Sequence, residues 1–143
     1  MKKITIPALL IAILMITGCE KEPLEISDFA VTQSLHDYKT DWKQIVRDEF
    51  GDDYTVADWK DLVRFHEKGG DLLELFDNLG LAKGVDVTIY YKGVRNYSAE
   101  RGYYATRHEH DKPSDYLAHD NIDNYLISLG SWSGSRKIMA IKK

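Results

Sequence analysis

The spacing of apolar residues changes once along the chain, at Lys83-Gly84, and this change constrains the fold more than any other feature. Before it, apolar side chains recur at the three- and four-residue spacing of amphipathic helices. After it, residues 85–91 (VDVTIYY) alternate between two faces, as half-buried strands do. We therefore expect an α+β domain with about three N-terminal helices followed by a four- to five-stranded antiparallel sheet.

Two of the expected helices share one sequence pattern. Residues 41–47 (DWKQIVR) and 58–64 (DWKDLVR) match at six of seven positions when Ile and Leu are counted as equivalent. Thr55 is expected to cap the second helix, with Asp58 three residues later. A third helix is expected from Asp71 to Gly80. Two copies are too few for a solenoid, so the repeat predicts a helical pair rather than a functional tandem motif.

The second half of the chain predicts strands joined by short turns. Lys92-Gly93 should join the first two strands, and Ser133-Gly134-Ser135 should join the last two as a terminal hairpin. Residues 108–124 are polar and contain Pro113, so we expect a long loop there. The predicted strands are 85–91, 94–97, 102–107, 125–132 and 137–141.

The first nineteen residues carry a separate signal. Two lysines precede an apolar run from Ile4 to Ile16, which has the length of a signal-peptide core and is short for a membrane span. The run ends at residues 16–19 (ITGC), where the only cysteine of the chain follows two small residues. This pattern resembles the lipobox of bacterial lipoprotein precursors.

The resemblance implies cleavage before Cys19, diacylglycerol on its sulfur and an acyl group on its new amine. Two or three acyl chains hold a protein on a membrane, whereas one is marginal. The implied organisation is a signal peptide at 1–18, a lipidated tether at 19–25 and a single domain at 26–143. Glu20 stands where an aspartate typically retains such proteins in the inner membrane, so the implied location is the outer membrane. The alternative is a secreted protein in which Cys19 is incidental.

Composition excludes several classes of protein. A formal net charge of −4 and a pI near 5.7 argue against a nucleic-acid partner, because such binders need a basic surface. A single cysteine excludes a disulfide framework and a thiolate zinc site. Residues 41–80 hold eleven acidic and five basic side chains, and residues 81–143 hold seven and ten. This segregation would make the molecule dipolar, although charged helix faces explain it equally.

A segment rich in His and Asp follows the strand at 102–107. If the strand continues, His108 and His110 share a face, and His119 could complete a zinc site with an open position for water. The alternative function is therefore a metal-dependent hydrolase, although a polar loop has the same composition and no HExxH pattern is present. Residues 120–124 (DNIDN) lack the spacing of an EF-hand calcium site.

Other catalytic patterns are weaker. Residues 130–134 (GSWSG) do not form a nucleophile elbow, because the serines flank a central Trp. Glu100 and Glu109 lie near aromatic strands and could form a glycosidase pair, but a chain with 23 acidic side chains brings some pair together by chance. We therefore predict no catalytic residue and expect a protein that is not an enzyme.

Aromatic and cationic side chains interleave along the expected sheet. Tyr, Trp and Arg are typical anchors of interfaces. Tyr90-Tyr91 and Tyr103-Tyr104 each put one ring on either side of a strand, so one ring of each pair should be outside the core unless both faces are covered. The predicted aromatic binding face consists of Tyr91, Arg95, Tyr97, Tyr103 and Arg107.

The predicted function is a membrane-anchored binding or adaptor module for an envelope protein or a glycan. Acylated Cys19 would be its contact with the membrane. A structural spacer of the envelope is a further alternative. No cofactor is expected apart from zinc in the hydrolase alternative.

Overall fold

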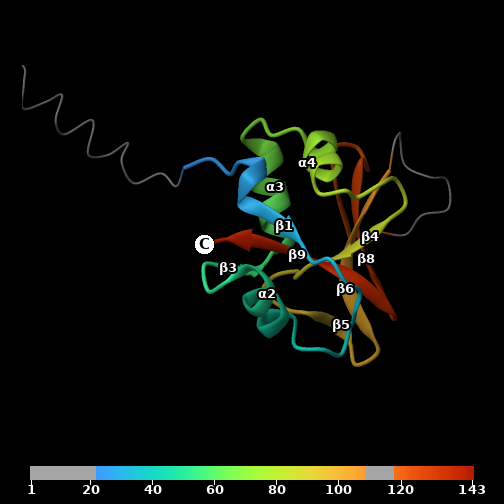
Figure 1. Ribbon diagram of the computed structural model, residues 1–143. Coiled ribbons are helices and arrows are strands. Elements are labelled where there is room, and N and C mark those ends of the chain that lie inside the picture. The colour runs from blue at the N-terminus through green and yellow to red at the C-terminus, as the bar shows by residue number, and fades with distance from the viewer. Residues whose placement is uncertain (1–21, 109–117) are drawn as a thin grey trace, which may run out of the picture.

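The computed structural model of the protein describes residues 22–108 and 118–143 (Figure 1). The signal peptide and Cys19 of the predicted leader lie outside these residues, as does His110. In the described part of the chain, no helix is both long enough and apolar enough to cross a membrane.

Strands outnumber helices in the described residues. The helical elements are η1 (Ile26–Asp28), a single 3₁₀ turn, α2 (Trp42–Phe50), α3 (Trp59–Glu67) and α4 (Leu72–Asn78). The strands are β1 (Phe29–Val31), β2 (His36–Asp37), β3 (Tyr54–Val56), β4 (Asp86–Thr88), β5 (Asn96–Ser98), β6 (Arg101–Arg107), β7 (Asp120–Ile122), β8 (Ile127–Trp132) and β9 (Ser135–Lys142).

The three α-helices form where the sequence pattern placed them, and each begins after an aspartate. The side chains of Asp41, Asp58 and Asp71 accept hydrogen bonds from backbone N–H groups in the first turn of their helices. Asp58, not Thr55, therefore caps α3. Thr55 lies in β3, a strand that the sequence pattern did not predict.

The predicted order of helices followed by an antiparallel sheet is wrong. β1 and β2 precede α2, and β3 separates α2 from α3. The sheet is mixed, because β4 and β9 pair in parallel with Val87 opposite Lys137. β7 also forms inside the segment expected to be a loop.

The predicted terminal hairpin is wrong as well. The sheet runs in the order β1-β9-β4-β6-β8-β7, so β4 and β6 lie between β8 and β9. β9 instead pairs with β1, β2 and β3, which are all antiparallel to it and far away in sequence. Local alternation identifies a strand but does not specify its partner, and here the partners are distant.

The Lys92-Gly93 turn is confirmed. Both residues have positive φ angles, 52° and 75°, and the flanking Tyr91 and Val94 exchange backbone hydrogen bonds. These are the features of the two-residue hairpin turn that matches strand twist. The chain beyond the turn then becomes β5, which pairs with β6 and not with β4.

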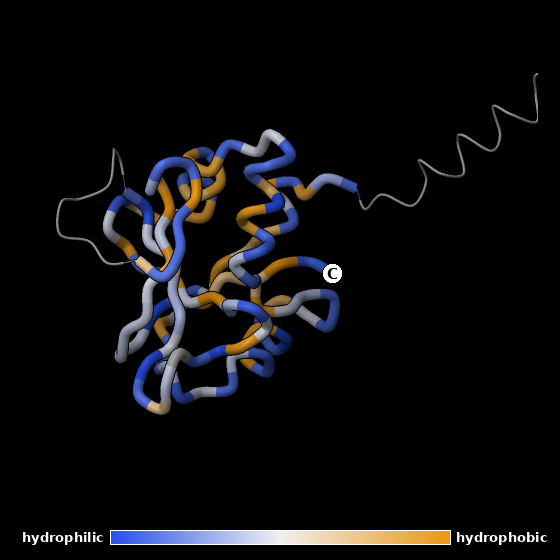
Figure 2. Tube along the Cα trace, turned by 180° about the vertical axis from the view of Figure 1, so that it is seen from behind, coloured by the Kyte–Doolittle hydropathy of each residue, from blue (hydrophilic) through white to orange (hydrophobic). Residues whose placement is uncertain are grey.

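The core is divided by the sheet. Along β9, Met139 and Ile141 belong to a larger cluster with α3 and α4, while Ile138 and Ala140 belong to a smaller cluster with α2. In Figure 1, α3 and α4 lie together on one side of β9 and α2 on the other. Figure 2 shows the molecule from behind, with many of the turns at its outside coloured as hydrophilic.

The repeated pattern therefore builds helices on opposite faces of one sheet. Trp42 is buried in the smaller cluster and Trp59 in the larger one. Each face is covered in part, and this explains the adjacent tyrosines: Tyr90 packs against the smaller cluster and Tyr91 against the larger.

Candidate functional site

The structure does not bring the five residues of the predicted aromatic binding face together. Tyr91 and Tyr103 contact each other edge to face, with ring centroids 5.2 Å apart, and pack against the larger cluster. Arg95 belongs to the other side, where its guanidinium lies 5.7 Å from the centre of the Trp42 ring. It also donates to the backbone carbonyl of Thr40 at 2.6 Å.

The remaining two residues do not restore this face. Arg107 forms an ion pair with Asp77 of α4, and its side chain is mostly buried. The side chain of Tyr97 lies outside what the structure describes. The arginines thus hold elements of the fold together instead of lining a common surface.

The described histidines have separate surroundings. His119 places Nε2 3.0 Å from Ser131 Oγ, and its ring packs edge to face on Tyr103. Burial lowers the pKa of His108, and the nearby carboxylate of Asp86 opposes that shift. Within residues 22–108 and 118–143, no group of three His, Cys, Asp or Glu side chains could hold a metal. A zinc site involving His110 lies outside the described residues.

The Asp-rich run at 120–124 has a structural role. Asp120 accepts a hydrogen bond from Trp59 Nε1 at 2.9 Å and another from the backbone of Asn121. Asp123, Asn124 and Tyr125 all adopt positive φ angles in the turn between β7 and β8. Asn and Asp tolerate this backbone region better than most residues, so the composition of the run follows from the turn.

The contact between Ser131 and His119 was not foreseen from the sequence, because β7 was expected to be a loop. A serine beside a histidine is the first requirement of a nucleophilic dyad. The pair lies on an exposed part of the molecule, and neither of the two hollows described below is lined by it. Glu100 lies exposed in the turn between β5 and β6, and Glu109 is outside the described residues.

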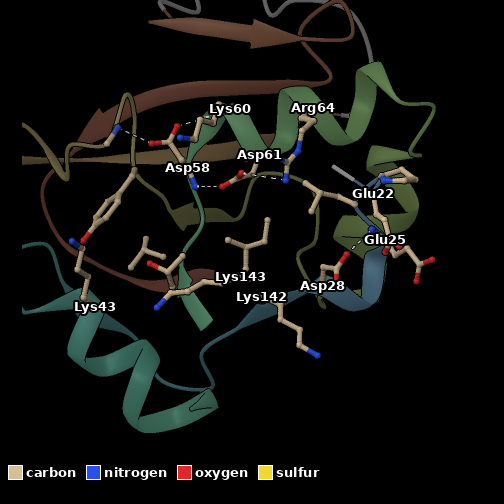
Figure 3. A pocket seen from close by; sticks show the side chains of 17 residues that line it. Glu22, Glu25, Asp28, Lys43, Asp58, Lys60, Asp61, Arg64, Lys142 and Lys143 are labelled. Carbon is tan, nitrogen blue, oxygen red and sulfur yellow. Dashed lines mark hydrogen bonds and ion pairs between the residues drawn. The ribbon is translucent and has the colours of Figure 1, made fainter. Parts of the chain in front are cut away.

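A wide hollow of about 820 Å³ lies where the chain leads into the domain (Figure 3). We call it the tether cleft. Its lining comes from residues 22–25, the first turns of α3 and the end of β9. Figure 3 shows Glu22, Glu25 and Asp28 gathered on one side and Lys43 and Lys143 on the other.

The buried carboxylates of the tether cleft are committed to the fold. Asp58 is only 6% exposed, and it accepts hydrogen bonds from the backbone of Lys60 at 3.1 Å and of Gly93 at 2.7 Å. Its own N–H donates to Asp61 at 2.8 Å. Burial raises the pKa of Asp61, and the backbone hydrogen bond and Arg64, 3.9 Å away, oppose the shift. These groups position α3 and the Lys92-Gly93 turn.

A second hollow, of about 350 Å³, lies at the start of β9 and is apolar on one side. We call it the Trp132 groove. Trp132, Leu35 and Val85 line it and are 59%, 64% and 41% exposed. In the described part of the chain these are three of the four large hydrophobic side chains left exposed, and the fourth, Val94, lies elsewhere.

A fixed arginine forms the polar side of the Trp132 groove. Arg136 donates through Nε to Asp86 at 3.1 Å, and its guanidinium lies 4.6 Å from the centre of the Tyr104 ring. The Tyr104 ring in turn lies directly against Gly130, where a Cβ atom would come within 2.5 Å of it. The arginine is only 15% exposed, so its position is set before any partner arrives.

The two hollows lie at opposite ends of one strand. β9 runs from Ser135 beside the Trp132 groove to Lys142 in the tether cleft. Phe29 of β1 pairs with Ile141, so the chain leads into the domain at the cleft end. A strand of this length spans roughly 25 Å.

Leu35, Val85 and Arg136 were missed as site residues. Leu35 is a single apolar residue among polar neighbours, and Val85 is the first apolar residue of the alternating run at 85–91. Trp132 carried the one usable signal, a large aromatic ring at a strand end next to a Ser-Gly-Ser turn.

No family model, curated protein or solved structure matches the chain.

Proposed function

We propose that this protein is a lipid-anchored, extracytoplasmic binding module that docks an envelope protein in the Trp132 groove. The observation that carries the proposal is the gathering of Trp132, Leu35 and Val85 at one hollow. Exposed apolar side chains are normal when scattered, whereas a contiguous set beside polar groups marks an interaction surface.

The chemistry of the groove favours a protein partner over a glycan. Leu35 and Val85 offer only apolar area, which matches an aliphatic or aromatic side chain and forms no hydrogen bond with sugar hydroxyls. Arg136 and Lys137 against the single Asp86 leave the rim with a net charge of +1, from two cations and one anion. We therefore expect the partner to insert an apolar side chain flanked by a carboxylate.

The place of the groove supports a partner beyond the membrane surface. At most about 11 Å of chain separates Cys19 from Glu22 at the tether cleft. The Trp132 groove lies at the other end of β9, so an anchor on Cys19 leaves it facing away from the bilayer. A module of this kind presents its partner at a fixed height above the lipid.

The test places a photo-crosslinking amino acid at Trp132 or at Val94 in the lipidated protein in intact cells. Val94 is the matched control, because its side chain is 53% exposed but lies outside the groove. We expect a discrete protein adduct from position 132 only, with an Asp or Glu next to the attached apolar residue. A glycan adduct, or the same adducts from both positions, would contradict the proposal.

A further inference from the structure

We propose that the tether cleft binds the zwitterionic headgroup of a membrane phospholipid, of the ethanolamine type, next to the protein's own anchor. The inference rests on the proposed attachment of lipid at Cys19, and it assigns a second, non-covalent membrane contact to the folded domain. It does not depend on the Trp132 groove or on the partner.

The tether cleft lies close to the proposed lipid anchor. Glu22, Pro23 and Leu24 line the cleft, and only two residues stand between Glu22 and Cys19. Three residue steps span at most about 11 Å, so an acylated Cys19 holds the cleft within reach of the headgroup layer. A hollow at that height meets lipid headgroups before any other abundant ligand.

Acidic and basic side chains lie on different walls of the cleft. One wall carries the carboxylates of Glu22, Glu25 and Asp28, and Arg64, which lies above Glu22 in Figure 3, pairs with Asp61 at 3.9 Å. The other wall carries the ammonium groups of Lys43 and Lys143 (Figure 3). Lys142 also lines the cleft. Within the described part of the chain, no ion pair joins the two walls.

The wall groups keep hydrogen-bond donors and acceptors for a ligand. Lys143 Nζ donates to the carbonyl of Asp52 at 3.3 Å, which uses one of its three hydrogens. Asp28 accepts from the backbone of Glu25 at 2.8 Å, which leaves its other lone pairs open. The carboxylates of Asp58 and Asp61, by contrast, already accept hydrogen bonds from backbone N–H groups at the start of α3 and from Gly93.

A ligand that fits both walls carries both charges. A simple anion would approach the three carboxylates of one wall, and a simple cation would approach the two lysines of the other. An ethanolamine headgroup offers its ammonium to the acidic wall and its phosphate to the lysine wall, through charge-assisted hydrogen bonds. A choline headgroup has the same charges but no N–H donors, and a glycerol headgroup lacks the positive charge. The cleft therefore distinguishes headgroups by the cation as well as by the phosphate.

The test uses the mature lipidated protein in phosphatidylcholine nanodiscs that contain phosphatidylethanolamine, phosphatidylglycerol or neither. Chemical acylation of each lysine is followed by mass spectrometry. We expect labelling of Lys43 and Lys143, relative to Lys68, to be about fivefold lower with phosphatidylethanolamine than with phosphatidylglycerol, because only the ethanolamine headgroup satisfies both walls through charge-assisted hydrogen bonds. Lys68, exposed beyond the far end of α3, is the internal control and should label equally in all discs.

A variant that neutralises the acidic wall separates headgroup recognition from simple shielding by the bilayer. With Glu22→Gln and Glu25→Gln together, we expect the preference for phosphatidylethanolamine to disappear and protection by phosphatidylglycerol to rise. The matched control is Glu67→Gln, an exposed site at the end of α3, which should keep the preference. Equal lysine protection in the three discs, or an unchanged preference in the double variant, would overturn the inference.

The same spectra distinguish the two proposals. Absence of acyl mass on the peptide that begins at Cys19 would remove the anchor, and with it the argument from position. Acyl mass together with equal protection in all discs would remove only the headgroup site.

Discussion

The two ends of β9 present opposite kinds of surface. At the Ser135 end, apolar side chains are exposed and the nearby charges pair with each other, as Arg136 does with Asp86. At the Lys142 end, Ile141 is buried and the charges face an open cleft. β9 buries its apolar residues where a helix or another strand covers them. Trp132, at the end of β8, is a large apolar side chain that no described helix or strand covers. We relate its exposure to binding and not to a weak core.

The largest effect expected is on binding at the apolar end. Trp132→Ala should reduce affinity for the captured partner by about 2 kcal/mol or more, roughly thirtyfold, because buried Trp anchors dominate interfaces. The thermal midpoint should change little, since the side chain is exposed in the free protein. Titration calorimetry and a thermal melt measure the two quantities.

Val94→Ala is the control for this comparison. It removes exposed apolar area outside the groove and should change neither quantity. Equal losses of affinity in both variants would show that exposure alone, and not the groove, determines binding.

The next effect concerns the rigid side of the groove. Gly130→Ala should lower the free energy of unfolding by about 2–3 kcal/mol, because the new Cβ would overlap the Tyr104 ring held beneath Arg136. Urea unfolding measures the loss. If the clash is the cause, Gly130→Ala should cost much less in a Tyr104→Ala background, as a double-mutant cycle would show. If the two substitutions instead lower the free energy of unfolding additively, the clash with Tyr104 is not the cause.

A somewhat smaller effect is expected at the charged end. Asp58→Ala should destabilise the fold by about 1–2 kcal/mol, because α3 loses its N-cap. The N–H of Gly93 also loses its acceptor. Asp58→Asn keeps an oxygen acceptor and should lose less. Partner affinity at the Trp132 groove should be unchanged in both variants under folding conditions. A loss of partner affinity together with the loss of stability would mean that the two ends of β9 are coupled.

The smallest effect is a pH dependence confined to the cleft. Burial raises the pKa of Asp61 above its ordinary 3.8, so the folded state binds this proton more tightly than the unfolded state. Stability contributed by this group is therefore greatest below pH 3.8 and falls as the pH rises through the folded pKa.

Asp61→Asn should remove this slope and keep an acceptor for the N–H of Asp58. Unfolding free energies of the two proteins, measured across that pH window, test it. Parallel curves would show that Asp61 titrates alike in the folded and unfolded states. Asp61→Ala, which also removes the acceptor, should be less stable than Asp61→Asn at every pH.

The helices could be predicted from the sequence because their signals are local. Asp41 and Asp58 stand directly before Trp42 and Trp59, and an aspartate at that place satisfies the first backbone N–H groups wherever the helix packs. The pattern gave no sign that the two helices cover opposite faces. The face depends on whether each Trp meets Ile138 or Met139 of β9, which lie more than 75 residues later in the chain.

The strands and the site could be predicted only in part. β6 and β8 follow from alternation, but the partners of β9 are set by long-range packing that no local pattern encodes. The adjacent tyrosines correctly indicated rings on both faces, yet the coverage of both faces by helices could not be read from them. Leu35 becomes part of a groove only because β2 pairs with the start of β9.

The central place of β9 also affects how the chain is made and moved. β9 follows every strand it pairs with, and among the described strands β1, β2 and β3 have no other partner. Closing such distant contacts costs loop entropy and delays folding until β9 has left the ribosome. A polypeptide that stays open throughout its synthesis is in the form that a secretion channel can thread, so this topology would suit the export that the proposed lipid anchor requires.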